Sequence, residues 1–203
     1  MTAKRGLLER LAQGPVICAE GFLFELERRG YCSAGEFVPE VALENPEALR
    51  MLHRDFQRAG SDVVQAFTYN GHREKMRVIG KEDILEPLNR AALRIAKEVA
   101  DSNPSGEPDL MAGNISNTNI WNPDDPATQD EVRAMFQEMC GWAADEGADM
   151  LIGETFYYHG EALAALEAMK RHDLPAVVTL GVMADGRMLD GPTPAETCAE
   201  LER

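Results

Sequence analysis

Residues 148–156 read Ala-Asp-Met-Leu-Ile-Gly-Glu-Thr-Phe. Met150, Leu151 and Ile152 are typical of a strand buried on both faces, and the apolar run ends in a single acid, Glu154. An unpaired carboxylate inside a sheet core is costly, because it loses its hydration without gaining a partner. At the C-terminal end of a parallel strand, however, an acid faces the pocket where α/β barrels keep their chemistry. The stretch therefore predicts a parallel α/β fold with a site at its strand ends.

The same design recurs along the chain. Polar residues follow three further apolar runs: Val16–Ile17 leads to Glu20, Val63–Val64 leads to Thr68, and Leu110–Met111 leads to Asn114 and Ser116. The carboxyl ends of parallel strands meet at one edge of a sheet. Polar residues at the ends of four strands, all at that edge, indicate a binding or active site.

The composition of the chain argues against several classes of binding partner and cellular location. The 203 residues are 44% hydrophobic and 27% charged, with a net charge of −15. This charge argues against nucleic acid and anionic membranes, because phosphate binding requires a basic surface. No apolar run reaches the ~18 residues that span a bilayer, and the N-terminus lacks a signal-peptide core. Four cysteines without a C-x-x-C pair predict reduced thiols in a cytoplasmic protein: Cys18, Cys32, Cys140 and Cys198.

Strand and helix patterns alternate, which is typical of βαβ units. The predicted strands are Val16–Ala19, Asp62–Thr68, Asp109–Ile115, Met150–Phe156 and Ala176–Val182. Five helices are predicted. The first has Asn45 as its N-cap and Pro46 as its first residue, the second spans Asp83–Val99, and the fourth spans Gly160–His172. The third and fifth begin at capping boxes, Thr128/Glu131 and Thr193/Glu196. Gly60 and Gly147 each follow a helix, at the position where a left-handed residue often ends it.

The fold class we predict is α/β, as the first five βα units of a (β/α)8 TIM barrel. Five units do not close a barrel, which needs eight. We therefore expect residues 1–203 to be the N-terminal portion of one barrel domain, although an open five-stranded sheet is the alternative. As part of a barrel, the strand Ala176–Val182 and the first strand should be unpaired edges that drive association of the isolated chain.

Several motifs, taken together in order and spacing, resemble the homocysteine S-methyltransferases, and within them the betaine–homocysteine methyltransferases. The resemblance covers nearly the whole chain. Its segments are residues 6–11 (GLLERL), 21–31 (GFLFELERRGY), 52–56 (LHRDF), 58–61 (RAGS), 65–68 (QAFT), 112–118 (AGNISNT) and 151–154 (LIGE).

The resemblance implies a (β/α)8 barrel that binds homocysteine and zinc at its C-terminal face. Family members hold zinc through a cysteine in a Gly-x-Asn-Cys context and two in a Gly-Gly-Cys-Cys motif. Neither motif occurs in this sequence, so we expect the ligands to lie beyond Arg203 and the four cysteines present not to be ligands. On this interpretation the chain binds no metal specifically. Stoichiometric zinc that is lost on Cys→Ser substitution would contradict it.

The resemblance also assigns substrate-binding residues. Glu154 matches the family acid that pairs with the substrate ammonium, with a structural acid as the alternative. Glu20, beside Gly21, stands one residue after the position of a second family acid, and it is either a substitute for that acid or a plain loop acid. Phe37 stands where the betaine enzyme has a tryptophan, and its ring either faces the onium donor or packs as an ordinary loop aromatic. Asn70 and Thr155 both stand where tyrosines occur. Thr68, Asn114 and Ser116 complete the predicted set.

The predicted function is methyl transfer from a betaine-like onium donor to the homocysteine thiol, giving methionine, with zinc required in the complete protein. We name no catalytic side chain, and we expect the 203-residue chain alone to be inactive. The partners are homocysteine and a small methyl donor, and a homo-oligomer remains open. One alternative is a non-catalytic half-barrel that binds an amino acid or a partner. Another is a different TIM-barrel enzyme, but Lys75 and Lys81 fall in the predicted loop after the second strand and neither ends a strand.

Overall fold

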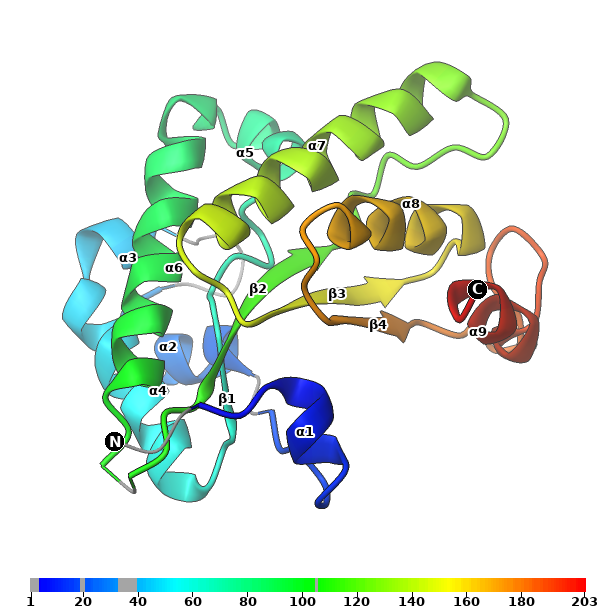
Figure 1. Cartoon of the computed structure of the whole chain (residues 1–203). Helices are drawn as coiled ribbons and strands as arrows, with labels where there is room; N and C mark the ends of the chain where they lie inside the picture. The colour runs from blue at the N-terminus through cyan, green and yellow to red at the C-terminus, as the bar shows by residue number, and fades with distance from the viewer. Residues whose placement is uncertain (1–3, 19–20, 33–39, 105) are drawn as a thin grey trace.

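The computed structural model describes residues 4–18, 21–32, 40–104 and 106–203. Its centre is a four-stranded parallel sheet whose strands lie side by side in chain order (Figure 1). The strands are β1 (Val63–Gln65), β2 (Leu110–Ser116), β3 (Met150–Phe156) and β4 (Ala176–Leu180). The helices are α1 (Leu7–Leu11), α2 (Phe22–Arg28), α3 (Val41–Glu44), α4 (Pro46–Ala59), α5 (Arg73–Val78), α6 (Leu85–Asp101), α7 (Pro126–Asp145), α8 (His159–Lys170) and α9 (Pro194–Leu201), with a 3-10 turn at Glu82–Ile84.

The connecting helices pack on one face of the sheet. Helix α6 contacts β1 and β2, α7 contacts β2, and α8 contacts β3 and β4 (Figure 1). Right-handed crossovers that always advance in the same direction place every helix on the same side. A doubly wound sheet would instead reverse its strand order and carry helices on both faces. The arrangement is therefore a segment of a barrel wall, and the predicted α/β class is confirmed.

Two apolar clusters line the two faces of the sheet. The outer cluster lies between the sheet and α6 to α8, and it includes the fully buried Phe136 and Phe156. The inner cluster is formed by Val63, Leu110, Ala112, Met150 and Ile152, with Leu7 of α1 packed against them. These inner residues alternate with outer ones along each strand, as the pleat requires. Helix α1 thus covers part of the face that would line a barrel interior.

Helix boundaries largely match the sequence signals. Helix α4 begins at Pro46, and Gly60 follows it with φ of 104°. Gly147 follows the α7 segment with φ of 80°, so both glycines adopt the left-handed conformation that side chains disfavour. Thr193 and Glu196 form the predicted reciprocal capping box of α9. None of the helices in the described ranges is long and apolar enough to cross a bilayer.

The predicted first strand is wrong as a regular element. In the described part of Val16–Ala19, only Cys18 forms a bridge, a parallel one to Val63. The amide of Ile17 donates to the Asp62 carboxylate at 2.8 Å, and Pro15 has no amide hydrogen. Because these two donors are lost to the ladder, the segment runs beside β1 without extending the sheet. The structure thus gives four strands and one bridge within the described ranges, where the sequence predicts five strands.

Two helix starts also differ from the prediction. Helix α7 begins at Pro126, and the Asp125 side chain caps it by accepting a hydrogen bond from the amide of Ala127 at 3.0 Å. Thr128 therefore lies inside the first turn, and the predicted Thr128/Glu131 capping box is wrong. An Asp followed by Pro supplies both an N-cap and an N1 residue, which explains the earlier start. The segment predicted from Asp83 opens as the 3-10 turn before α6.

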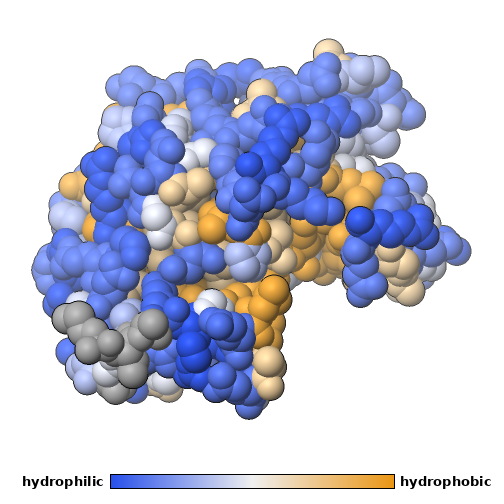
Figure 2. Space-filling view, in the orientation of Figure 1, coloured by the Kyte–Doolittle hydropathy of each residue, from blue (hydrophilic) through white to orange (hydrophobic). Residues whose placement is uncertain are grey.

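The 203-residue polypeptide should associate in solution. Figure 2 shows apolar surface gathered in the hollow between α1 and α9, over β3 and β4. Apolar residues of the chain with large exposed fractions include Ile17 at 55%, Val182 at 48% and Met183 at 40%. Strand β4 has one hydrogen-bonded neighbour, β3, among the described strands. Exposed apolar surface beside an unpaired edge drives association. Light scattering should detect oligomers, whereas a monomer that binds no apolar dye would contradict this expectation.

Candidate functional site

A cavity of about 240 Å³ lies at the C-terminal ends of the strands. Gln65 ends β1 and Glu154 lies near the end of β3, so the cavity sits at the edge that the sequence predicts. Aromatic rings form much of its wall. The lining residues are Gly21, Phe22, Leu23, Phe24, Gln65, Ala66, Phe67, Tyr69, Asn70 and Glu154. Among the described residues, the cavity therefore combines an apolar wall with one carboxylate and a few neutral polar groups.

Neighbouring elements hold the Glu154 carboxylate in place. The side chain is 7% exposed, and its Oε1 accepts a hydrogen bond from Nε2 of Gln65 at 3.0 Å. Oε1 of Gln65 in turn accepts from Sγ of Cys18 at 3.3 Å. The Gln65 amide holds Oε1 through a neutral donor, which fixes the position of the carboxylate without itself adding a positive charge. The arrangement is suited to binding an ammonium group.

A strained turn of the backbone follows Glu154 directly. Thr155 has φ of 62°, which is unusual for a β-branched residue, and the pairing of β3 with β4 is irregular between Gly153 and Phe156. The amide of Thr155 donates to Oγ1 of Thr179 at 3.0 Å, and its carbonyl accepts from Nδ2 of Asn117 at 2.9 Å. These contacts hold a bulge, and bulges beside a site commonly re-aim a side chain.

A buried polar cluster lies beside the cavity. Nζ of Lys75 donates to Oδ1 of Asn70 at 3.0 Å and to Oγ of Ser116 at 3.3 Å. The same nitrogen lies 4.7 Å from the centroid of the Tyr69 ring. Burial lowers the pKa of Lys75 to about 8. His72 caps the N-terminus of α5 through Nδ1, and burial, with a further contribution from Lys75, lowers its pKa to about 3.

The structure brings together some of the predicted site residues. Glu154, Gly21 and Asn70 line the same cavity, and Ser116 reaches Asn70 through Lys75. Gly21 has φ of 95° and precedes α2, so its left-handed conformation is one that glycine adopts at little cost.

Other predicted residues lie elsewhere. Thr68, Asn114 and Thr155 do not line this cavity. Oγ1 of Thr68 donates to the Asn114 carbonyl at 2.7 Å. The buried Asn114 amide has no hydrogen-bond partner within the described ranges. Glu20 and Phe37 fall outside the residues that the structure describes.

The sequence interpretation misses Gln65, Tyr69 and Lys75. Gln65 belongs to the segment QAFT that supports the resemblance, and its place at the end of an apolar strand is an available signal. Lys75 is predicted to lie in a loop, but it lies on α5 and is 4% exposed. It does not line the cavity, so its amine is not presented to a ligand as the lysine of an aldolase would be.

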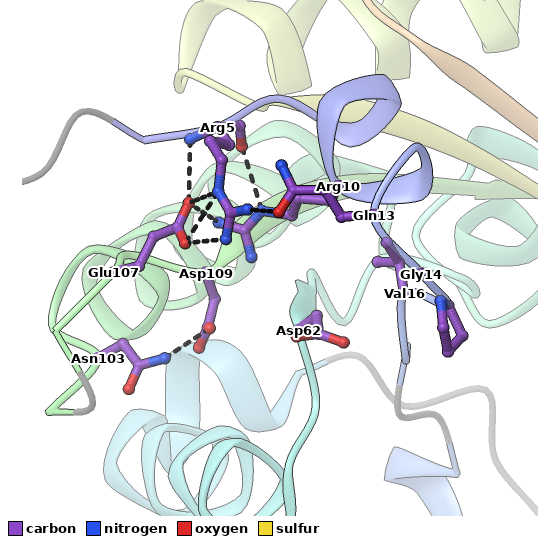
Figure 3. A pocket seen from close by; sticks show the side chains of 10 residues that line it. Arg5, Arg10, Gln13, Gly14, Val16, Asp62, Asn103, Glu107 and Asp109 are labelled. Carbon is purple, nitrogen blue, oxygen red and sulfur yellow. Dashed lines mark hydrogen bonds and ion pairs between the residues drawn. The ribbon is translucent and has the colours of Figure 1, made fainter.

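A roomier cavity of about 390 Å³ lies at the opposite end of the sheet (Figure 3). Several of its polar side chains already bond to one another: Nε of Arg5 donates to Oε1 of Glu107 at 3.0 Å, and Nδ2 of Asn103 donates to Oδ1 of Asp109 at 2.6 Å. Hydrogen bonds from Arg5 lower the pKa of Glu107 to about 2. Barrels keep their chemistry at the C-terminal face. We therefore assign this cavity a structural role, in which it ties the N-terminal segment to the loop before β2.

The described residues do not fit a zinc site. No three His, Cys, Asp or Glu side chains in those ranges converge on a point that could hold a metal. Cys140 is buried on α7, where burial raises the pKa of its thiol to about 12, and zinc requires the thiolate. Cys198 is exposed on α9. We therefore derive no chemical step through a metal.

Comparison with known proteins decides the family. The model of the family described as homocysteine S-methyltransferase matches residues 17–203. The chain belongs to the homocysteine S-methyltransferase family. The resemblance inferred from the sequence motifs is thus confirmed.

Curated relatives of this family member include two kinds of methyltransferase. S-methylmethionine–homocysteine S-methyltransferase BHMT2 from Pongo abelii is 39% identical over 202 residues, which are 98% of this chain and 52% of the relative. Betaine–homocysteine S-methyltransferase 1 from Sus scrofa is 39% identical over 204 residues, covering 98% of this chain and 71% of that protein. The chain spans about half the length of most of the curated relatives it matches, for example 48% of the Rattus norvegicus betaine enzyme.

A solved structure supports the fold. The homocysteine methyltransferase MmuM from Escherichia coli, in its metallated form, superposes with a TM-score of 0.78 at 22% identity. The match covers 96% of this chain and 73% of that one. The four-stranded segment therefore has the arrangement found in a homocysteine methyltransferase, and at least one such enzyme has been solved with metal.

Proposed function

We propose that this chain is the N-terminal portion, residues 1–203, of a homocysteine-binding barrel domain that transfers a methyl group from an onium donor to the homocysteine thiol. The products are methionine, the demethylated donor and the proton released from the thiol. The observation that carries the proposal is the Glu154 carboxylate, held by Gln65 in an otherwise largely apolar and aromatic cavity. Membership of the family and the position of the cavity at the strand ends support it.

The chain's own residues would bind and orient the substrate. Glu154 would accept hydrogen bonds from the ammonium of homocysteine, and Gln65 would hold its carboxylate in one rotamer. The aromatic rings of Phe22, Phe67 and Tyr69 would exclude water from the reacting groups. Fixed orientation and exclusion of water both favour in-line attack of sulfur on a methyl carbon, with the electron pair of the breaking bond leaving on the donor.

The donor is an onium compound of the betaine type. Relatives that carry betaine and S-methylmethionine in their names are equally similar at 39% identity. We propose betaine as the first candidate. An aromatic wall suits a quaternary ammonium or a sulfonium through cation–π attraction. Phe37 and Glu20 remain proposed substrate contacts from the sequence alone.

We further propose that the complete protein requires zinc, with ligands from residues other than those described. The metallated form of a relative supports a metal in this family. A cytoplasmic location is also proposed, because the structure pairs none of Cys18, Cys32, Cys140 and Cys198 in a disulfide.

Methyl transfer can be tested directly with the protein as its gene encodes it. Homocysteine is incubated with methyl-13C betaine or methyl-13C S-methylmethionine, and products are followed by NMR. Labelled methionine from either donor is expected, and the more productive donor identifies the preference. Homocysteine binding without transfer from any onium donor would contradict the reaction, and absence of homocysteine binding would contradict the substrate.

A further inference from the structure

Lys75 is a buried cation that the proposed function leaves without a role. It is 4% exposed, and removal of an ammonium from water is costly unless the surroundings replace the lost hydration. In the described ranges its contacts include two neutral polar groups and a ring: Asn70, Ser116 and Tyr69. Glu161 of α8 also acts on it electrostatically. A neutral methionine of similar length would pack there at less cost, so the charge calls for an explanation.

The ammonium fixes which way the Asn70 amide faces. An ammonium only donates hydrogen bonds, so the group 3.0 Å from Nζ has to be the acceptor, Oδ1. The other end of the amide, Nδ2, then points away from Lys75. No residue in the described ranges accepts a hydrogen bond from Nδ2, although Asn70 is only 9% exposed and lines the cavity.

Ser116 fixes which groups donate and which accept hydrogen bonds around Lys75. Its hydroxyl donates to the Tyr69 carbonyl at 2.5 Å, which leaves the oxygen to accept from Nζ of Lys75 at 3.3 Å. If the Asn70 amide were flipped, its Nδ2 donor would face the Nζ donor of Lys75. The hydrogen bond from Nζ to Oδ1 would be lost, and the buried ammonium would have fewer acceptors. The hydrogen-bond roles of Lys75, Ser116 and Asn70 are therefore determined together.

We infer that Lys75 is a positioning residue, which presents the Nδ2 donor of Asn70 to the cavity to bind a carboxylate of the ligand. The inference rests on the proposed function and extends it. Glu154 supplies negative charge on one wall of the cavity, and Asn70 with Lys75 behind it supplies a donor and positive charge on another. A zwitterionic ligand would be oriented by the two walls. Both homocysteine and betaine carry a carboxylate, so both are candidate sources of it.

Asn70→Asp is the decisive substitution. It keeps the acceptor that faces Lys75 and nearly the same shape, but it replaces the donor Nδ2 by a charged acceptor. Calorimetry on the protein as its gene encodes it compares homocysteine with homocysteamine, its decarboxylated analogue, and betaine with tetramethylammonium. We expect the preference for the carboxylate-bearing member of one pair to fall about 10- to 100-fold, as for loss of a charge-assisted hydrogen bond. The pair affected identifies the source of the carboxylate.

Lys75→Met tests the positioning role separately. Asn70 keeps its donor in this variant but loses the group that orients it, so the same preference should fall by a smaller factor, about 3- to 10-fold. Arg90→Met, on α6, removes a cation that pairs with Glu86, Asp145 and Glu146 and is the control for loss of a cation. Thermal unfolding shows whether each variant is folded.

The pH dependence gives a second measurement. The Lys75 ammonium loses its proton as pH rises through its pKa of about 8, so the wild-type preference for a carboxylate should weaken between about pH 7 and about pH 9. Titratable or aromatic groups in the described ranges that act on Lys75 include the Tyr69 ring, His72 and Glu161. His72, with a pKa of about 3, stays neutral over this range. The Lys75→Met variant should lose the trend.

The outcomes separate this inference from the proposed function. Wild-type protein that binds neither homocysteine nor betaine overturns both. Wild-type binding with unchanged preferences in Asn70→Asp and Lys75→Met overturns the inference alone. Equal losses for a ligand and its decarboxylated analogue also overturn it, since they indicate a purely structural role. A selective loss for the carboxylate-bearing ligand supports it.

Discussion

Glu154→Gln should weaken homocysteine binding by about 1.5–3 kcal/mol, the range for a hydrogen bond to a charged group. The substitution removes the negative charge with little change of shape. The amide oxygen introduced by the substitution can still accept from Nε2 of Gln65, the group that now lies 3.0 Å from Oε1 of Glu154. The side chain should therefore stay in place, and the loss should report the ammonium contact. Calorimetric titration with homocysteine, on the protein as its gene encodes it, measures the effect.

A matched variant separates this contact from a general loss of charge. Glu146→Gln removes a carboxylate that pairs with Arg90 and Arg94 near the end of α7, at a distance in the fold from the cavity. Homocysteine affinity should be unchanged in that control. Zinc content should survive in both variants, because neither acid is a ligand in our interpretation. An unaltered homocysteine affinity in Glu154→Gln would make Glu154 a structural acid.

The sheet and the position of Glu154 can be predicted because their signals are local. An apolar run is itself a strand signal, and a lone acid at its end stands out against the residues before it. The predicted bounds of Met150–Phe156 are those that the structure gives. Helix starts are predicted correctly where a cap follows a simple pattern, as at Thr193, and missed where Asp125-Pro126 offers a stronger start than Thr128.

The partners within the site cannot be predicted in the same way, because they depend on contacts between distant segments. Gln65 and Glu154 lie 89 positions apart in sequence, and they meet through the registers that place β1 beside β2 and β2 beside β3. A charged residue such as Lys75 is usually exposed, so its burial on α5 contradicts the local expectation. The segment at Cys18 is predicted as a full strand, but it forms a single bridge. Its hydrophobicity does not reveal that the amide of Ile17 donates to the Asp62 side chain instead of to a neighbouring strand.

The bulge at Thr155 links the site to the outer core. Strand alternation places Met150 and Ile152 on the inner face, and Glu154 continues that alternation toward the cavity. Regular alternation would also place Phe156 on the inner face, yet it belongs to the outer cluster. The irregular pairing between Gly153 and Phe156 accounts for the change of face. Packing of Phe156 against the helices therefore anchors the end of the strand that carries Glu154.

Phe136→Ala should accordingly lower the free energy of unfolding by about 3–5 kcal/mol, the usual range for truncation of a buried phenylalanine. Phe136 of α7 is fully buried, and its ring meets that of Phe156 edge to face at a centroid distance of 5.8 Å. Truncation removes this contact and leaves a cavity between α7 and the sheet. The measurement is urea unfolding of the protein as its gene encodes it, followed by circular dichroism.

The chain contains a matched control for this truncation. Phe24→Ala removes the same atoms from a side chain that is 72% exposed, so its effect on stability should stay within about 0.5 kcal/mol. Because Phe136 supports the strand end through Phe156, folded Phe136→Ala protein should also bind homocysteine more weakly than wild type. A loss of stability below about 1 kcal/mol would show that the outer core closes over the missing ring. In that case the anchoring of Glu154 through Phe156 would be wrong.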